Sequence, residues 1–427
     1  MKTIVIVGGG AGGLELATRL GNKLGKKKKA RVILIDKNRT HVWKPLLHEV
    51  ATGSLDTNTD GVVYRAHGSK QGYKFILGTM EGLDKDAKQV CLSPIVDGDN
   101  KEIVPARQVD YDYLVMAVGS VSNDFGTPGV AKECFFLDSQ AQAERFHRAL
   151  LNQFLRVHQK DEAQLSLSIV GGGATGVELS AELCHVADIL KVYDMPDVSV
   201  KLKVNLIEAG PRILPALPER ISASAKAELA RLGVNVMEGV AVKEAKPEGF
   251  YTKDDELIAS DLMVWAAGVK APDFIKAMEV FDTSRNGQIL VKPTLESTAS
   301  DDIYVLGDCC AFQNEDGSFV PPRAQSAHQM ATTVGSNLLA KLAGKAQKPF
   351  VYKDHGSLVN LSRYSTVGSL MGNLGSGKMF VEGRIARVMY VSLYRMHQFA
   401  VYGWVGASLL YLANKIGRSV QPKMKLH

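Results

Sequence analysis

The sequence has few cysteines, and their arrangement excludes several kinds of site. Five occur in 427 residues, at Cys91, Cys134, Cys184, Cys309 and Cys310, and none forms a C-x-x-C pair. An odd number without paired spacing argues against a disulfide framework. We therefore expect reduced cysteines, with the neighbouring Cys309 and Cys310 in the core, and we predict no metal site.

Acidic residues are absent from the C-terminal part of the chain. From Gly383 to the end there are seven Lys or Arg residues and no Asp or Glu, within an overall net charge of +6. A second basic cluster, Lys26–Lys29, is expected in a solvated helix end or loop. Neither cluster is interleaved with a nucleic-acid-reading motif, so no nucleic-acid partner is expected. The first apolar run begins almost at Met1, which leaves no room for a signal peptide and favours a cytoplasmic start.

A glycine-rich turn between two short apolar runs is the first motif. Ile4–Val7 predicts a strand, Gly8–Gly13 follows, and apolar residues then recur at helical spacing. Val32–Ile35 predicts a second strand, which Asp36 closes. This order matches the G-x-G-x-x-G unit that binds the pyrophosphate of a dinucleotide at a helix N-terminus, with the acid on a ribose. The alternative is a glycine-rich turn inside an ordinary α/β core.

The same unit occurs a second time along the chain. Leu167–Val170, Gly171–Gly176 and Val204–Glu208 repeat the strand, the glycine turn and the strand that ends in an acid. The closing strand is repeated as well, since Leu262–Gly268 corresponds to Leu114–Gly119. Two dinucleotide-binding units in one chain suggest electron transfer between two dinucleotides. A structural duplication with an inactive second site is the alternative.

Other segments are expected to complete an α/β fold. Ile303–Asp308 predicts a strand whose carboxyl end places Asp308 at the ligand crevice. Helices are predicted over Ala141–Val157 and from the segment Pro321–Gln329 to about Leu342, and a loop is predicted near Met195. Short antiparallel strands are predicted around Phe75–Leu77, Gln89–Leu92 and Ile103–Val104. We expect two Rossmann-like dinucleotide-binding domains, residues 1–125 with 285–345 and residues 126–284, and a C-terminal membrane-associated helical region, residues 346–427.

The C-terminal region combines basic and apolar residues. Strands are predicted at Leu358–Leu361 and Thr366–Leu370, followed by a long helical region, Gly383–Arg418. Between Arg395 and Lys415 lie 19 uncharged residues, which is close to the length that spans a bilayer. Polar residues and two glycines interrupt this stretch and basic residues flank it, which favours a helix lying in the membrane interface. A buried core or dimer helix and a spanning helix are the alternatives.

Together these features resemble the two-dinucleotide-binding flavoprotein superfamily, in which the first module holds FAD and the second NAD(P)H. Many members have a redox-active cysteine pair just after the first module, whereas this chain has no cysteine before Cys91. Flavin-to-disulfide chemistry is therefore excluded. Within the superfamily the chain resembles the bacterial type II NADH dehydrogenases, which are single-subunit, non-proton-pumping NADH:quinone oxidoreductases. The segments that carry this resemblance are Trp43–Gly53, Gly171–Glu182, Ile213–Pro215, Gly307–Cys309 and Ala324–Gln329.

The resemblance implies which residues hold each ligand. Those for FAD would be Gly8, Gly9, Gly10, Ala11, Gly12, Gly13, Asp36, Lys37, Lys44, Met80, Gly119, Asp308, Ala324 and Gln325. Those for NADH would be Gly171, Gly173, Gly176, Glu208, Ala267 and Gly268. Those for the quinone would be Gln325, His328, Gln329 and Arg363. Glu208 disfavours a 2′-phosphate by charge repulsion, so NADH is preferred over NADPH. Arg212 nearby is the one residue that weakens this preference, and its alternative role is a solvated surface charge.

Glu178 is the candidate catalytic residue. It lies in the first turn of the helix after the second glycine motif, where the helix dipole favours an acid, so a purely electrostatic placement is the alternative. The resemblance places it near the nicotinamide, where it would orient the cofactor or manage protons. It also implies hydride transfer from NADH to non-covalently bound FAD and two-electron reduction of a membrane quinone, ubiquinone or menaquinone, in a respiratory chain.

The resemblance further implies a homodimer bound peripherally (monotopically) to the cytoplasmic face of the bacterial inner membrane, where each nearby Lys or Arg adds roughly 1 kcal/mol of attraction. Two other functions are considered. A sulfide:quinone reductase needs a redox-active cysteine pair, for which Cys134, Cys309 and Cys310 are not obviously spaced. A flavin-bearing, NADH-responsive regulatory or scaffold protein would be expected to carry additional partner-binding domains.

Overall fold

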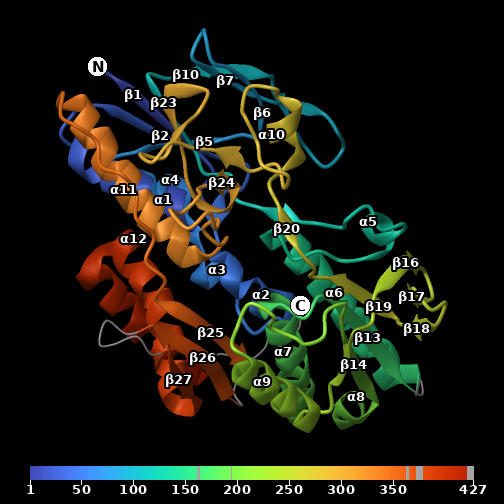
Figure 1. The fold of residues 1–427 in the computed structure, drawn as a ribbon. Coiled ribbons are helices and arrows are strands. Elements are labelled where there is room, and N and C mark those ends of the chain that lie inside the picture. Colours follow the sequence, from blue (N-terminus) through green and yellow to red (C-terminus); the bar gives the residue numbers. More distant parts are fainter. Residues whose placement is uncertain (161–163, 194, 362–364, 372–377, 421–427) are drawn as a thin grey trace.

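The computed structural model describes residues 1–427 except 161–163, 194, 362–364, 372–377 and 421–427 (Figure 1). Its largest sheet has the strand order β22-β23-β11-β1-β2-β5, and all neighbours are parallel except β22 and β23. The central strands are buried, as parallel strands covered on both faces must be. The bounds are β1 Thr3–Val7, β2 Arg31–Asp36, β5 Lys74–Leu77, β11 Tyr113–Met116, β22 Glu296–Ser297 and β23 Ser300–Val305.

The expected antiparallel direction of the strand around Phe75–Leu77 is wrong. Helix α4, Tyr64–Gln71, carries the chain back across the sheet, so β5 pairs parallel with β2. The predicted strands at Gln89–Leu92 (β7) and Ile103–Val104 (β9, Glu102–Val104) are confirmed as antiparallel. Their partners are β6 Met80–Asp84, β10 Arg107–Asp110 and β8 Ile95–Val96.

A second sheet repeats the first on a smaller scale, in the order β15-β14-β13-β19, with all strands parallel. Helix α7, Ala174–Leu190, follows the second glycine turn, as predicted. The loop expected near Met195 is in part a helix, α8, because Pro196 starts its first turn. The bounds are β13 Leu165–Val170, β14 Leu202–Glu208, β15 Asn235–Glu238, β19 Leu262–Trp265, α8 Pro196–Lys201 and α9 Glu219–Arg231.

Smaller elements surround and connect the two sheets. Strands β12 and β20 pair with each other and link the two units, and β16, β17 and β18 form an antiparallel flap beside the second sheet. Their bounds are β12 Val121–Ser122, β20 Val269–Lys270, β16 Val242–Lys246, β17 Gly249–Thr252 and β18 Leu257–Ala259. Further elements are β3 Thr40–His41, β4 Val62–Val63, β21 Ile289–Leu290, β24 Cys310–Ala311, α2 Leu47–Thr52, α3 Thr57–Asp60, α5 Val130–Glu133, α6 Gln140–Lys160 and α10 Asp273–Ala277.

The C-terminal region packs beside the first unit. Helix α11, Ala324–Leu342, lies against α1, Ala11–Leu20, and the red C-terminal elements lie below this pair in Figure 1. Three antiparallel strands, β25 Gly356–Leu361, β26 Ser365–Met371 and β27 Lys378–Glu382, precede α12, Gly383–Val420. The predicted long helix is interrupted at Gly403, whose φ of 72° and ψ of 172° are not helical. Among the described residues, no helix is long and apolar enough to cross a bilayer.

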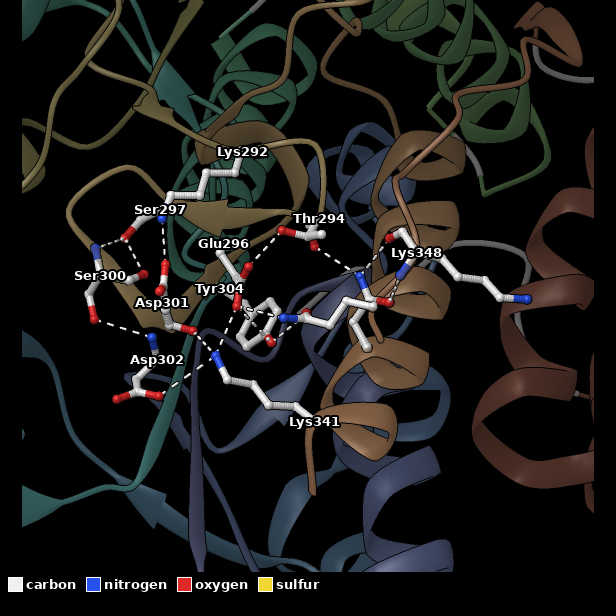
Figure 2. A network of polar contacts seen from close by, with 12 residues as sticks. Lys292, Thr294, Glu296, Ser297, Ser300, Asp301, Asp302, Tyr304, Lys341 and Lys348 are labelled. Carbon is white, nitrogen blue, oxygen red and sulfur yellow. Dashed lines mark hydrogen bonds and ion pairs between the residues drawn. The ribbon is translucent and has the colours of Figure 1, made fainter. Parts of the chain in front are cut away.

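A polar network fixes α11 to the edge of the first sheet (Figure 2). The buried Glu296 carboxylate accepts hydrogen bonds from Lys341 Nζ (2.9 Å), Gln347 Nε2 (2.8 Å) and Thr294 Oγ1 (2.7 Å). Tyr304 donates to the Gln347 amide oxygen at 2.7 Å. Burial acts to raise the pKa of Glu296, yet these hydrogen bonds outweigh it and hold that pKa below its usual range.

We expect Lys341→Met to destabilise the protein by about 3 kcal/mol, because it leaves Glu296 charged, buried and short of its cation. Since the pKa of Glu296 is lowered on folding, its contribution is complete above the ordinary carboxyl pKa and is lost as the pH falls through the lowered value. The defect should therefore be large at neutral pH and small in acid. Urea-induced unfolding at both pH values measures it.

Lys292→Met is the matched control, because Lys292 pairs with Asp301 at the surface, where the two side chains are 41% and 70% exposed. Its expected cost is within about 0.5 kcal/mol. Equal losses for both substitutions would show that the Glu296 network does not stabilise the fold.

Candidate functional site

The first glycine turn is shaped for close approach by a ligand. A Cβ atom at Gly8, whose φ is +105°, would lie 2.2 Å from the Ala117 carbonyl oxygen, and one at Gly13 would lie 1.9 Å from the Gly8 oxygen. At Gly10 the opposite holds, since no atom of the described residues lies within 4 Å of the Cβ position. Gly10 is the N-cap of α1, so its backbone faces open space where unpaired N–H groups can receive a phosphate.

Asp36 closes this turn at the end of β2. Its Oδ2 accepts the Gly9 N–H at 2.6 Å, and its Oδ1 accepts the Asn38 N–H at 2.7 Å. Burial raises the pKa of Asp36 against the effect of these bonds. Each oxygen retains a lone pair for a ribose hydroxyl. Of the other predicted residues here, Lys37 is exposed and Met80 is buried in the core.

The second glycine turn reproduces the first bond by bond. A Cβ at Gly176 would lie 2.0 Å from the Gly171 oxygen, while no described atom lies within 4 Å of the position at Gly173. Glu208 replaces Asp36, accepting the Gly172 N–H at Oε2 and the Gly210 N–H at Oε1, each at 2.7 Å. The sequence repeat therefore extends to the hydrogen bonds that shape each turn.

The residues after strand β19 also contribute to this turn. The Cβ position of Gly171 lies 2.7 Å from the Ala267 nitrogen, and Gly268 follows with a φ of +64°. In the first unit the Val118 nitrogen, after β11, has the same relation to Gly8, at 2.8 Å from its Cβ position. In both units the closing strand thus ends against the glycine turn.

The hydrogen bonds that Asp36 and Glu208 accept in the described structure come from backbone N–H groups and not from Arg212. Its guanidinium donates to the carbonyl oxygens of Leu217 (2.8 Å), Pro215 (2.9 Å) and Leu214 (3.4 Å). The side chain therefore supports the turn that follows β14. Its role in the fold explains the presence of a cation close to Glu208.

Lys44 and Asp308 meet through a serine that the sequence reasoning did not identify. Lys44 Nζ donates to the Ser120 carbonyl oxygen at 2.9 Å and to its hydroxyl at 3.1 Å, and that hydroxyl donates to Asp308 Oδ2 at 2.7 Å. Asp138 Oδ1 lies 3.9 Å from Lys44 Nζ. The available signal was a polar residue directly after Gly119, the end of the repeated closing strand.

The predicted quinone residues on α11 have different environments. Gln325 donates to the Gly356 oxygen at 3.0 Å and accepts the His355 N–H at 3.2 Å, and Gln329 pairs with the Lys353 backbone at 2.8 and 3.0 Å. Both amides thus hold residues 353–356 along the helix. Ala324 is the first residue of α11.

His328, a further quinone candidate on α11, contacts α1 rather than residues 353–356. The His328 side chain is 37% exposed and its Nδ1 lies 2.5 Å from Glu15 Oε2 on α1. This hydrogen bond raises the pKa of His328 against the effect of its burial. Arg363 lies outside the residues that the structure describes.

Glu178 lies on α7 and is buried against α2 and β25. Its Oε1 accepts the Asn360 N–H of β25 at 3.0 Å, and His48 Nδ1 of α2 lies 3.7 Å from its Oε2. One turn later on α7, the buried Glu182 accepts a hydrogen bond from Ser54. Burial lowers the pKa of His48. His48 and Glu182 were not predicted, although a second glutamate four residues after the first was a visible signal.

The cysteines are poor candidates for a sulfur-transferring site. Cys134, Cys309 and Cys310 are free and buried, and burial raises the pKa of Cys134 and of Cys309 to about 12. The pKa of Cys310 is raised as well. Since the thiolate is the reactive form, burial disfavours reaction at these three thiols.

Comparison with known proteins places these observations in context. Residues 2–331 match the family described as pyridine nucleotide-disulphide oxidoreductase. The chain is 46% identical over 444 aligned positions to the type II NADH:quinone oxidoreductase of Haemophilus influenzae, covering 100% of both chains. It is 29% identical over 388 residues to the enzyme of the same name from Staphylococcus aureus, covering 88% of this chain and 92% of that one.

Solved structures share the fold. NDH2 from Plasmodium falciparum, in complex with NADH, superposes with a TM-score of 0.83 over 99% of this chain and 100% of that chain, at 19% identity. The sulfide:quinone oxidoreductase of Aquifex aeolicus gives a TM-score of 0.75 over 99% and 96% of the two chains, at 16% identity. At these identities the likeness shows a shared fold.

Proposed function

The chain belongs to the pyridine nucleotide-disulphide oxidoreductases and, within them, to the type II NADH:quinone oxidoreductase family, and from this premise we propose how its residues carry out the reaction. The enzyme uses FAD and NADH and reduces a quinone. NADH, a proton and the quinone are consumed, and NAD⁺ and the quinol are formed. When bound, FAD accepts the hydride of NADH and supplies two electrons to the quinone.

The duplicated glycine turn is the observation that carries this proposal. Gly10 and Gly173 each leave an open cradle that a Cβ atom would fill, so the chain has room for two dinucleotides. We assign FAD to the first turn and NADH to the second. The FAD domain then comprises residues 1–125 and 285–345, the NADH domain residues 126–284, and the membrane and dimer region residues 346–427.

Several side chains are proposed to orient the cofactors. Asp36 binds the adenosine ribose of FAD, and the linked Lys44, Ser120 and Asp308 hold its ribityl chain and the flavin. The first N–H groups of α11, at Ala324 and Gln325, offer a positive partial charge to the flavin ring. Each of these groups binds or orients, whereas the electron chemistry belongs to the cofactors.

Glu208 and Glu178 are proposed to act on the NADH side. Glu208 accepts two backbone N–H groups, which hold its side chain at the turn, and an acidic side chain there repels a 2′-phosphate and favours NADH. Glu178 holds or transfers a proton beside the nicotinamide. The quinone approaches along α11, bordered by Gln325, His328 and Gln329.

Steady-state oxidation of NADH with a short-chain quinone tests the proposed activity. Replacement of NADH by NADPH in the same assay tests the assignment of Glu208, because the phosphate should lower kcat/KM by about tenfold or more. Comparable rates with both nucleotides would remove Glu208 from the specificity site.

We propose that the second half of α12 binds the cytoplasmic face of the membrane, in a homodimer that brings two such helices to one surface. After the break at Gly403, this segment exposes Trp404, Val405 and Leu409, whose side chains are 75%, 75% and 63% exposed. Neighbouring Lys415 adds positive charge. An apolar, basic helix of this kind lies in the headgroup region.

Replacing Trp404, Val405 and Leu409 together by Ser should release the protein from anionic lipid vesicles. At about 1.5–3 kcal/mol for each apolar side chain, partitioning should fall by roughly 1,000-fold or more. Co-sedimentation with vesicles measures the bound fraction.

A matched triple variant, in which the exposed Val96, Ile103 and Phe319 become Ser, should still bind the vesicles. Binding of the α12 variant as tightly as the unaltered protein would place the membrane surface elsewhere.

A further inference from the structure

A chain of buried polar side chains connects the C-terminal helix to the first glycine turn. Glu15 Oε1 of α1 lies 2.7 Å from His397 Nδ1 of α12, and His397 Nε2 lies 3.0 Å from His41 Nε2. His41 Nδ1 lies 2.9 Å from the Gly9 carbonyl oxygen. All three side chains are buried, and α12 packs directly on α1.

The hydrogen-bond pattern assigns the protons in this chain. The Gly9 carbonyl only accepts, so His41 Nδ1 donates to it. Burial lowers the pKa of His41 to about 3, so its ring is neutral and its Nε2 accepts from His397. Burial acts to raise the pKa of Glu15, but hydrogen bonds from His328 and His397 outweigh it, and the group is a carboxylate. The two ring nitrogens of His397 therefore both face acceptors, Glu15 Oε1 and His41 Nε2.

The Gly9 peptide is held at both ends by this arrangement. Its N–H is donated to Asp36 at 2.6 Å, and its carbonyl accepts from His41 and from the Tyr64 hydroxyl, the latter at 2.7 Å. The next residue, Gly10, opens the cradle at the start of α1. Rotation of the Gly9 carbonyl would therefore reorient the backbone that faces the ligand.

The anchored part of α12 ends just before its break. His67 Nε2 lies 3.0 Å from the Val401 oxygen, two residues before Gly403. A helix that breaks there leaves the Val401 carbonyl without its usual partner four residues later, and His67 satisfies it. The segment that carries His397 is thus fixed to the first domain, and the exposed apolar segment begins after it.

We propose that Glu15, His397 and His41 are positioning residues for FAD, which hold the Gly9 peptide in its orientation and so set how long the cofactor stays bound. This inference rests on the proposed assignment of FAD to Gly8–Gly13. It makes FAD retention dependent on a side chain that lies in the C-terminal region, outside the glycine turn itself.

The rate of FAD release from the holoenzyme, followed by the fluorescence of free flavin, tests the proposal. His397→Ala and His41→Ala should each accelerate release by about tenfold, since each removes a charge-assisted or buried hydrogen bond. If His397 acts through His41, the double variant should release FAD no faster than His41→Ala alone. The KM for NADH should be unchanged in all three.

His67→Ala is the matched control. It also removes a buried histidine that seats α12, but His67 contacts Tyr73 and Val401 rather than Gly9. Its melting temperature should fall while the rate of FAD release stays within about twofold of the unaltered value. If His397→Ala does not fold, Glu15→Gln replaces it in the double-variant comparison with His41→Ala. We expect Glu15→Gln to accelerate FAD release at least about threefold, a smaller effect because it removes only the charge.

The possible results separate this inference from the function on which it rests. Unchanged FAD release in the His397 variant, or additive effects of the His397 and His41 substitutions, would overturn the proposal. Acceleration by His67→Ala as large as that by His397→Ala would also overturn it, since general loosening of α12 would then explain the effect. An unaltered protein that binds no FAD would overturn the assignment of the first turn itself.

Discussion

Gly173→Val should abolish NADH oxidation while leaving the fold and the bound FAD intact. Gly173 has a φ of −72° and a ψ of −177°, which valine adopts without strain, and no described atom lies within 4 Å of its Cβ position. The new side chain would fill only the cradle for the NADH pyrophosphate. Loss of two charge-assisted hydrogen bonds, at about 1.5–3 kcal/mol each, predicts a fall in kcat/KM of roughly 100-fold or more. Steady-state kinetics measure the loss of NADH oxidation, and the flavin absorbance shows whether FAD stays bound.

Gly10→Val is the matched variant in the first turn, with a similar backbone conformation, φ −61° and ψ −174°, and equally open surroundings. It should yield a folded protein without flavin and without activity. If Gly173→Val loses FAD and Gly10→Val keeps it, the assignment of the two cofactors is reversed. If neither substitution affects cofactor binding, the glycine turns are structural only.

Glu178→Gln should lower kcat by about 100-fold, because proton management by a positioned acid is worth roughly 100- to 10,000-fold. Glutamine keeps the size of the side chain and the oxygen that accepts the Asn360 N–H, so the fold should be unaffected. Anaerobic reduction of the flavin by NADH and its reoxidation by quinone, measured separately, should locate the defect in one half of the cycle.

Glu182→Gln provides the comparison for this effect. Glu182 is equally buried, one turn later on α7, and it accepts a hydrogen bond from Ser54 rather than from β25. We expect its kcat to stay within about threefold of the unaltered value. Equal losses in the two variants, or normal kinetics in both, would reduce Glu178 to an electrostatic feature of the helix N-terminus.

The glycine turns were predictable because they are local. The same few residues supply the tight turn, the close helix packing and the acid, so a single stretch of sequence contains most of the dinucleotide cradle. The sequence also shows the closing strand twice, and both copies are present as β11 and β19, which end at Met116 and Trp265. The helix predicted to open in the Pro321–Gln329 segment and to run to about Leu342 is confirmed as α11, whose first residue is Ala324.

Other features depend on contacts that local sequence does not record. The direction of β5 depends on the crossover through α4, and alternation alone does not distinguish parallel from antiparallel pairing. The break at Gly403 lies in an otherwise continuous helical pattern, where a glycine is often tolerated. Glu15 and His397 are separated by 382 positions, so only the folded chain reveals their pairing.

The break at Gly403 divides α12 into two segments with different surroundings. The segment after Gly403 exposes its apolar side chains, whereas the segment before it contacts the FAD domain through His397 and Val401. The break thus separates the side chains proposed to bind lipid from those proposed to hold the cofactor. Substitutions on the two sides of Gly403 should accordingly affect different properties, vesicle binding after it and FAD retention before it.

Anaerobic rapid mixing tests the central claim, that electrons pass from NADH through FAD to a quinone. Mixing the oxidised protein with NADH alone should bleach the flavin absorbance in one turnover, and subsequent addition of a ubiquinone or menaquinone analogue should restore it. Both steps should be at least as fast as steady-state turnover. Flavin that NADH does not bleach, or reduced flavin that stays reduced when the quinone is added, would contradict the account.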